Sequence, residues 1–264
     1  MKKCLIIGCG WLGRPLVEAL QKQNIQVAAT TTNDQKFIEM QAVQIHSLKL
    51  NRENGILTWD SAPTKHFDSI IFTFPPFEGV LGAMRSLLSP LTFDQLIFTS
   101  STGVYKESNA FLNEEAPIDP EHTVTLMEEA VKDLAPEKYM ILRLAGHIGP
   151  NRHPLRYFLA QQKVIANGNA PVNLIHQRDI ISAIITCVKQ QVCQKTYNLC
   201  SPEHPTKQAY YGELAKNLAG IELEFAPGKI GKKIDGSKIT EELSFCYEES
   251  IQNISALDLI KDNI

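Results

Sequence analysis

A glycine-rich turn near the start of the chain constrains the fold more than any other feature of the sequence. It lies between an apolar run, residues 4–7, and an amphipathic stretch, residues 14–20. This order predicts a buried strand, a tight turn and a helix whose amino terminus faces the end of the strand. The free amides and positive dipole end of such a terminus favour phosphate groups. The segment therefore predicts a cradle for the pyrophosphate of a dinucleotide.

Each glycine of this turn has its own expected role. Gly8 allows the tight turn, Gly10 lets phosphate approach the backbone, and Gly13 allows the helix to pack on the strand. Trp11 and Leu12 complete the predicted cofactor-binding turn. The alternative is that the glycines form only a tight connection between strand and helix.

Composition limits the class of protein. The chain has 264 residues, 44% of them apolar, and a formal net charge of −3. Without a basic field, nucleic acid is not an expected partner. No apolar run approaches the ~20 residues that span a bilayer, so no membrane partner is expected either. The six cysteines include no CxxC pair, which argues against a metal site or disulfide framework and predicts a cytoplasmic protein.

Strand-like and helix-like segments alternate along the chain. Buried strands are predicted at 26–30, 69–74, 95–100 and 139–144. Apolar residues at helical spacing predict helices at 79–91, 124–134 and 178–189. This alternation predicts an α/β fold with a doubly wound parallel sheet and helices on both faces.

The pattern changes near residue 200. We expect a dinucleotide-binding core at 1–200, in which 151–171 forms a loop and helix towards a small C-terminal lobe at 201–264. Within the lobe the sequence predicts a helix at 206–218, a strand near 223–225 and a Gly/Lys-rich loop at 228–233.

The end of the second predicted strand bears on the choice between NAD and NADP. Sites for NAD usually place Asp or Glu there to bind the ribose hydroxyls. Here the sequence has Thr30, Thr31 and Thr32, with Lys36 nearby. These residues suit a 2′-phosphate, so NADP is favoured over NAD; the alternative is a polar loop in which Asp34 supplies the acid in a shifted register.

Two prolines follow the strand predicted at 69–74. Phe74 and Pro75 begin an extended segment that could line the nicotinamide ribose. The alternative is an ordinary turn, because proline ends a strand ladder in any case.

Hydroxyl side chains follow the strand predicted at 95–100. The segment reads Thr99-Ser100-Ser101-Thr102-Gly103-Val104-Tyr105 and lacks the leading glycine of a G-x-S-x-G nucleophile elbow. It resembles the SSxxVY segment of the extended and atypical branch of the short-chain dehydrogenase/reductase superfamily, which includes epimerase/dehydratase-like proteins. The resemblance implies that Ser101 is the active-site serine.

The resemblance extends over nearly the whole chain. Further matching segments lie at 142–154, 172–179, 197–202 and 231–238. Together they make the chain similar to the YeeZ-like NAD(P)-binding proteins. The likeness implies a Rossmann fold in which Ser100, Ala145 and Gly146 contact the cofactor.

The chain departs from the superfamily at the Tyr-x-x-x-Lys pair, in which lysine lowers the pKa of the catalytic phenol. The matching segment, 121–132, contains no tyrosine. Glu128 and Lys132 keep the four-residue spacing, and we expect an exposed ion pair rather than a catalytic substitute.

Another group would then have to move the proton of any hydride transfer. The candidates by position are Tyr105, His122, His147 and His176, each with a structural role as its alternative. Arg143, Arg152 and Arg178 could bind an anionic substrate or form salt bridges at the edge of the sheet.

Two functions follow from these residues. The first is an oxidoreductase, epimerase or dehydratase that uses NADP or NAD on a nucleotide sugar or small carbonyl compound. The second is a non-catalytic dinucleotide-binding or redox-sensing protein, which the missing Tyr/Lys pair favours. Either would act as a monomer or homodimer.

Overall fold

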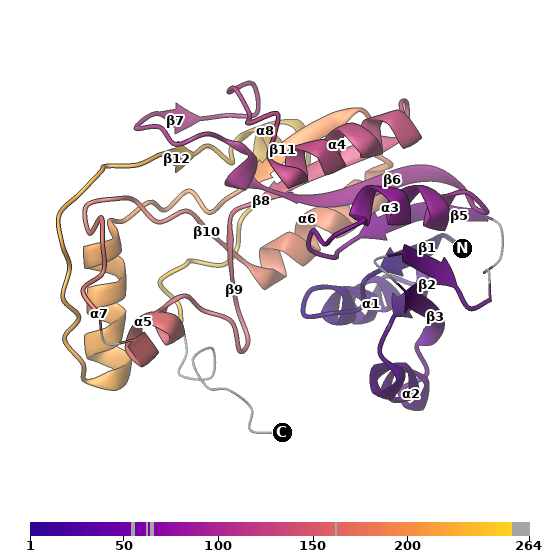
Figure 1. Cartoon of the computed structure of the whole chain (residues 1–264), viewed down its shortest axis with the longest axis horizontal. Coiled ribbons are helices and arrows are strands. Elements are labelled where there is room, and N and C mark those ends of the chain that lie inside the picture. The colour runs from indigo at the N-terminus through magenta and orange to yellow at the C-terminus, as the bar shows by residue number, and fades with distance from the viewer. Residues whose placement is uncertain (54–55, 62, 64–65, 162, 255–264) are drawn as a thin grey trace. The chain divides into compact units, whose positions relative to one another are not determined.

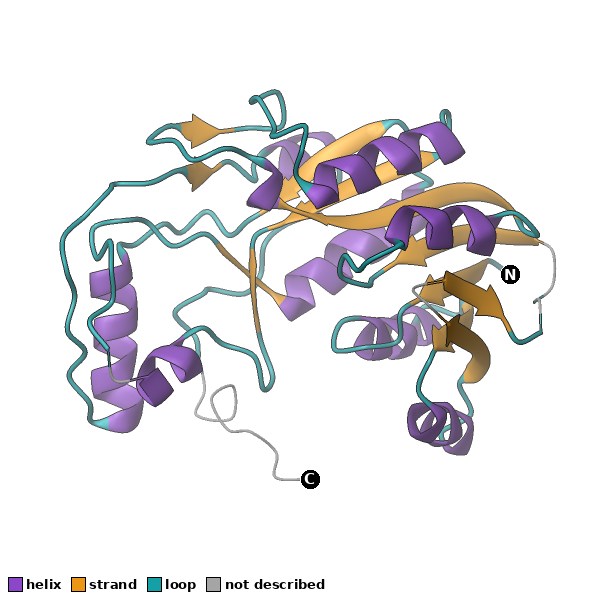
Figure 2. Ribbon diagram, viewed as in Figure 1, coloured by secondary structure: helices purple, strands orange, loops and turns teal. Residues whose placement is uncertain are grey.

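The structure is a computed structural model that describes residues 1–53, 56–61, 63, 66–161 and 163–254. Helices and strands alternate along most of these residues (Figures 1 and 2). The strands are β1 Lys3–Ile7, β2 Gln26–Thr31, β3 His46–Glu53, β4 Ile56–Trp59, β5 His66–Phe72, β6 Thr92–Ser101, β7 Phe111–Leu112, β8 Tyr139–Leu144, β9 Gly146–Ile148, β10 Leu174–His176, β11 Lys195–Leu199 and β12 Lys233–Ile234. The helices are α1 Gly13–Lys22, α2 Asp34–Ala42, α3 Val80–Leu88, α4 Thr123–Leu134, α5 Leu155–Gln161, α6 Gln177–Gln190, α7 Lys207–Ala219 and α8 Lys238–Glu242, with a 3-10 turn, η1, at Thr102–Val104.

An eight-stranded sheet organises the described residues in the order β11-β8-β6-β5-β1-β2-β3-β4. β1 pairs in parallel with β2 and β5, β2 with β3, and β5 with β6. β4 runs antiparallel to its neighbour, β3. The largely parallel sheet flanked by helices confirms the predicted α/β Rossmann-like fold.

The predicted buried strands are confirmed because each carries a run of apolar residues. The inner part of β1, Cys4 to Ile7, is at most 1% exposed, as expected of a central strand covered on both faces. β5 ends at Phe72, two residues before the predicted end, and the prolines that follow cannot extend the ladder.

One predicted strand is wrong. Residues 223–225 form no strand, and Phe225 makes only an isolated bridge with Ile165. The segment is short and contains a charged residue, and Pro227 follows closely. The helix predicted before it is confirmed as α7, which begins after the N-cap Thr206 and ends at Ala219, before the C-cap Gly220 with its φ of 67°.

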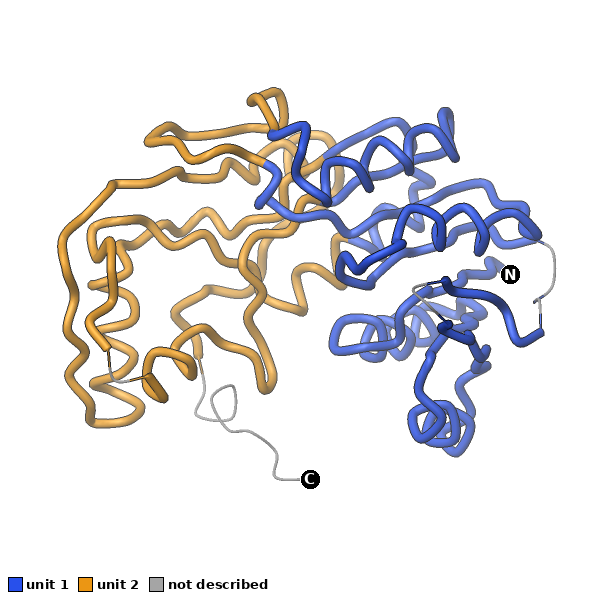
Figure 3. The backbone as a smooth tube through the Cα atoms, in the orientation of Figure 1, with its two compact units in different colours: residues 1–104, 119–142, 184–196 blue, residues 105–118, 143–183, 197–264 orange. Residues whose placement is uncertain are grey.

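The chain divides into two compact units that each draw on separate stretches of sequence (Figure 3). Unit 1 comprises residues 1–104, 119–142 and 184–196, and unit 2 comprises 105–118, 143–183 and 197–264. Unit 2 has its own apolar cluster, which includes Leu155, Leu174 and Tyr210. The division predicted at residue 200 stays a prediction.

Candidate functional site

The glycine turn of unit 1 connects β1 to α1. Gly8 has a φ of 111°, a left-handed conformation that glycine adopts without strain. A Cβ on Gly13 would lie 2.3 Å from the Gly8 carbonyl oxygen, whereas a Cβ on Gly10 would meet nothing within 4 Å. Gly8 thus forms the turn, Gly13 brings helix and strand together, and Gly10 leaves its backbone open to approach.

The start of α1 is free to receive an anion. Its N-cap residue, Leu12, makes no side-chain cap hydrogen bond, and the first turn contains no acidic residue. Leu12 is 7% exposed and packs into the core, whereas Trp11 is only half-buried. Amide groups and the positive end of the helix dipole are therefore not neutralised by the helix's own side chains.

The end of β2 holds the glycine turn in place. The Gly8 amide donates to Thr30 Oγ1 at 3.1 Å, and the Cys9 amide donates to the Thr30 carbonyl at 2.9 Å. Thr31 Oγ1 accepts from the Asn33 amide at 3.1 Å. Two of the three predicted threonines thus shape the site from buried positions, while Thr32 is exposed.

A cavity of about 290 Å³, which we name the turn cavity, opens beside this turn. It lies at the carboxyl ends of the strands of unit 1, where ligands bind in open α/β sheets. Its lining contains seven residues that the sequence predicts to bind the cofactor: Gly8, Gly10, Thr30, Thr31, Thr32, Phe74 and Pro75.

The turn cavity is basic. Lys36 and Arg52 line it, and its described lining contains no Asp or Glu. Asp34, the acid of the alternative register, has a side chain that is 93% exposed and pairs with Lys49 instead. The cavity therefore presents two cations where an NAD-selective site usually presents a carboxylate.

Arg52 and Phe77 form a stacked pair at the cavity. The guanidinium carbon of Arg52 lies 4.6 Å from the centroid of the Phe77 ring, and Phe74 lies 5.8 Å from Phe77. Cation–π contact orients the guanidinium plane. The sequence did not point to Arg52, because β3 carries few apolar residues and no strand is predicted there.

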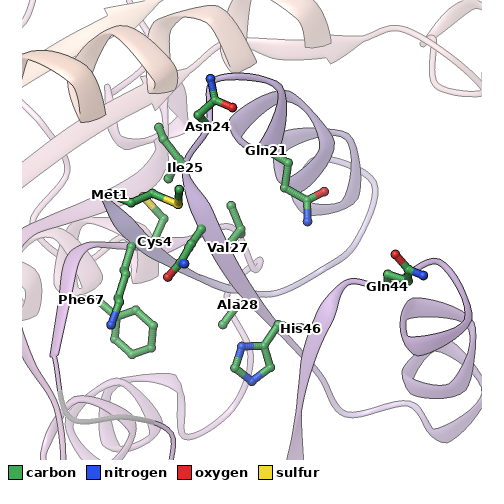
Figure 4. Close-up of a pocket in the computed structure, with 12 residues that line it drawn as sticks. Met1, Cys4, Gln21, Asn24, Ile25, Val27, Ala28, Gln44, His46 and Phe67 are labelled. Carbon is green, nitrogen blue, oxygen red and sulfur yellow. The ribbon is translucent and has the colours of Figure 1, made fainter.

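A second cavity, of about 610 Å³, lies at the opposite, amino edge of the strands of unit 1. Figure 4 shows residues of its lining, which include Cys4 of β1, Val27 of β2 and His46 of β3. This position is remote from the glycine turn along each strand. The second cavity is therefore separate from the candidate dinucleotide site.

The exit of β6 contains a buried hydrogen bond that the sequence did not predict. Ser100 donates to a carboxylate oxygen of Glu128, and these residues are 4% and 0% exposed. The expected ion pair of Glu128 with Lys132 is wrong, since Lys132 pairs with Glu129 at 2.8 Å. Glu128 faces the sheet because it shares a helix face with the buried Val124 and Val131.

The buried face of α4 carries neither tyrosine nor lysine among the described residues. Its buried members are Val124, Thr125, Met127, Glu128, Ala130 and Val131. The helix begins after His122, whose Nδ1 accepts from the Val124 amide at 3.2 Å. Ser101, at the end of β6, has an Oγ that accepts from the Gly103 amide at 3.0 Å.

Three of the predicted catalytic residues, Tyr105, His147 and His176, lie in unit 2. Tyr105 is 2% exposed; its hydroxyl donates to Asn198 at 2.7 Å and accepts from Arg143 at 2.9 Å. Burial raises the pKa of this phenol. A phenol in such a network stabilises the packing of unit 2 rather than offering a free acid.

The start of α6 uses two further predicted residues of unit 2. His176 Nδ1 accepts from the Arg178 amide, which is the structural role that the sequence allowed as an alternative. Arg178 itself pairs with Glu249 at 2.9 Å. These contacts stabilise the beginning of the helix.

The exit of β8 is closely packed at the two residues expected to contact the cofactor. Ala145 is buried, and a Cβ on Gly146 would lie 2.9 Å from Leu174. Small residues therefore suit the packing at both positions. Their contact with a cofactor stays a prediction.

His147 has a pKa well below the usual value for a histidine. Burial and the nearby charge of Arg152 lower its pKa to about 4. The imidazole is therefore neutral at pH 7. A neutral ring with so low a pKa is a poor proton donor at neutral pH.

The low pKa of His147 predicts a loss of stability in acid. A histidine whose pKa is lower in the folded than in the unfolded state stabilises the protein above the unfolded value of 6.5, and this contribution is lost as the pH falls towards 4. We expect the free energy of unfolding to drop by up to about 3 kcal/mol over this range through His147. Urea unfolding of the wild type and of His147→Gln at pH 7 and pH 4 measures this change in the free energy of unfolding. If the two proteins differed in that free energy by the same amount at both pH values, the prediction would be contradicted.

Neither a metal site nor a membrane span is found in the described part of the chain. Among those residues no group of His, Cys, Asp or Glu is arranged to hold a metal ion. In the same stretches, every helix is too short or too polar to cross a bilayer.

Comparison with known proteins gives the family. No family model matches the chain. Protein YeeZ of Escherichia coli strain K12 is 32% identical over 270 residues, which cover 94% of this chain and 96% of YeeZ.

Solved structures show the same fold at lower identity. A UDP-glucuronic acid 4-epimerase from Bacillus cereus in complex with NAD has a TM-score of 0.74 and 16% identity, over 97% of this chain and 94% of its own. A short-chain dehydrogenase/reductase superfamily protein from Agrobacterium tumefaciens with bound NAD has a TM-score of 0.73 and 17% identity, over 94% of this chain and 93% of its own. The chain therefore belongs to the YeeZ family and has the Rossmann-like fold of epimerases and short-chain dehydrogenases/reductases.

Proposed function

We propose that the protein binds NADP(H) in the turn cavity and uses it in oxidoreductase or epimerase chemistry on a small carbonyl compound or nucleotide sugar. The observation that carries the proposal is the basic lining beside an open glycine turn. A bound nicotinamide would supply or accept a hydride. NAD in two structures of the same fold supports a dinucleotide as the ligand.

The residues present fit such a ligand. Gly10 and the uncapped start of α1 suit the pyrophosphate, since no described residue other than the chain neighbours of Gly10 lies within 4 Å of the position of its Cβ. Thr32, Lys36 and Arg52 suit a 2′-phosphate. Neither cation forms an ion pair with a carboxylate among the described residues, so both charges are available to a phosphate.

This assignment predicts a preference for NADPH. We expect NADPH to bind about 10- to 100-fold more tightly than NADH, because charge-assisted contacts contribute about 1.5–3 kcal/mol. The variants Lys36→Ala and Arg52→Ala should reduce NADPH affinity towards that of NADH and leave NADH affinity unchanged. Nicotinamide fluorescence titration measures both constants.

A matched control is Lys22→Ala, which removes an exposed cation at the end of α1, away from the turn cavity. It should leave both affinities unchanged. Equal or tighter binding of NADH by the wild type would overturn the preference for NADP. A protein that bound none of NAD, NADH, NADP and NADPH would overturn the proposed function itself.

A second candidate function is a non-catalytic dinucleotide-binding or redox-sensing protein. The buried face of α4, which lacks tyrosine and lysine in the described chain, favours it. The two functions differ in turnover. Loss of the reduced nicotinamide absorbance with nucleotide sugars or small carbonyl compounds supports the enzyme, and binding without turnover supports the sensor.

A further inference from the structure

We propose that Ser101, His122 and the bare Cα of Gly103 form a two-donor site for the carbonyl oxygen of the substrate. The inference rests on the proposed function and assigns this chain a replacement for the missing Tyr/Lys pair. All three residues belong to unit 1.

Gly103 brings the two side chains together. A Cβ built on Gly103 would lie 3.2 Å from Ser101 Oγ and 3.7 Å from His122 Nε2. Both polar atoms therefore lie beside the space that a side chain at Gly103 would fill. Gly103 is exposed, and Ser101 and His122 are half-buried, so a ligand can reach the space between them.

The hydrogen bonds of His122 fix which ring nitrogen is the donor. Its Nδ1 accepts from the Val124 amide at 3.2 Å as the cap of α4. In the neutral ring the proton is then on Nε2, the nitrogen that faces Gly103. No described residue accepts from this Nε2–H, which leaves it available to a ligand.

Ser101 is also held by a hydrogen bond from the backbone that leaves its own donor hydrogen available. Its Oγ accepts from the Gly103 amide at 3.0 Å. The hydroxyl hydrogen donates to none of the described residues and can be given to a ligand oxygen. The site also lies at the positive end of α4, a helix of twelve residues with no acid in its first turn, which favours negative charge there.

This arrangement supplies charge stabilisation rather than proton transfer. A hydride would come from the reduced nicotinamide of NADPH, the cofactor of the proposed function, whose C–H bond breaks as NADPH is oxidised to NADP⁺. When this hydride adds to a carbonyl carbon, a new C–H bond forms on the substrate and the π electron pair of the C=O bond moves onto oxygen. Ser101 and His122 hold that oxyanion by two hydrogen bonds, and it then takes a proton from water. Removing one such donor typically costs about 10²–10³-fold in kcat.

The first test observes the site without turnover. In ¹⁵N-histidine NMR of the free protein we expect His122 to carry its proton on Nε2, and glyoxylate or pyruvate to shift that resonance. Gly103→Ala should abolish the shift, since its methyl group fills the space between the donors. Gly82→Ala in α3, where a Cβ meets nothing within 4 Å, should retain it. A proton on Nδ1, or the same shift in Gly103→Ala, would overturn the site.

The second test uses NADPH oxidation with glyoxylate. His122→Ser keeps a cap for α4, because serine is a good N-cap residue, but removes the Nε2–H donor. We expect kcat to fall about 100-fold, as in Ser101→Ala, with NADPH affinity and Tm unchanged. His66→Ser, at an exposed histidine of unit 1, should keep full activity. An unchanged rate in His122→Ser would overturn its role.

These tests separate the inference from the proposed function. Gly103 and His122 do not line the turn cavity, so their variants should bind NADPH like the wild type. If the wild type fails to bind NADPH, the proposed function falls, while the NMR result on the free protein still decides whether the two donors form an oxygen site.

Discussion

The substitution Gly10→Leu is expected to reduce NADPH affinity by about 100-fold or more, which corresponds to about 2.7 kcal/mol, in a protein that remains folded. The side chain would project into the space through which the pyrophosphate approaches the start of α1. Apart from the chain neighbours of Gly10, no described residue has an atom within 4 Å of the new Cβ, so the fold has room for a side chain there. Fluorescence titration measures the affinity, and urea unfolding measures the stability.

The control for this variant is Gly82→Leu in α3. Gly82 is exposed and also has nothing within 4 Å of its Cβ position, but it lies outside the turn cavity. Its affinity for NADPH should match that of the wild type. Undiminished binding by Gly10→Leu would remove the glycine turn from the binding site and the premise of the proposed function with it.

The centre of the sheet could be predicted because its strands have a simple signature. β1 and β6 are runs of apolar residues that are buried on both faces, and the glycines after β1 fix the change of direction. Local residue types therefore determine this part of the fold. The predicted helices are confirmed for the same reason, with ends that differ by a few residues.

The edge of the sheet could not be predicted in the same way. β3 is mostly polar, and Leu50 is its only buried residue among those described. Its place in the sheet depends on pairing with β2 across the intervening helix α2, which the residue pattern of β3 itself does not specify. Arg52, at the end of this strand, was missed with it, although it is one of two cations in the turn cavity.

The candidate site, like the sheet, could be predicted from the sequence only in part. Spacing predicted that Gly8, Gly10 and Gly13 form a turn. The positive φ of Gly8, the open space at Gly10 and the close approach at Gly13 are consistent with the expected roles. Spacing did not predict that Ser100 donates to Glu128, because the contact joins residues from β6 and α4. A contact between side chains of different elements can be predicted only from the tertiary structure. A turn can be predicted from residues that are neighbours in the sequence.

The second large effect concerns stability. Gly13→Ala is expected to lower the free energy of unfolding by about 2–3 kcal/mol, since its Cβ would lie 2.3 Å from the Gly8 carbonyl oxygen. Backbone atoms cannot rotate away as a side chain does, so α1 must move from β1. We expect the displaced turn to weaken NADPH binding as well. Urea unfolding at pH 7 measures the change.

Gly82→Ala is the comparison variant, and we expect it to raise the free energy of unfolding rather than lower it. The same methyl group in the interior of α3 meets nothing within 4 Å and replaces the glycine by a better helix former, so unfolding should cost about 0.5–1 kcal/mol more than in the wild type. If Gly13→Ala were as stable as the wild type, α1 would not pack on β1 at the distance described. The glycine would then be needed for the ligand alone, and Gly13→Ala would reduce NADPH affinity without a change in stability.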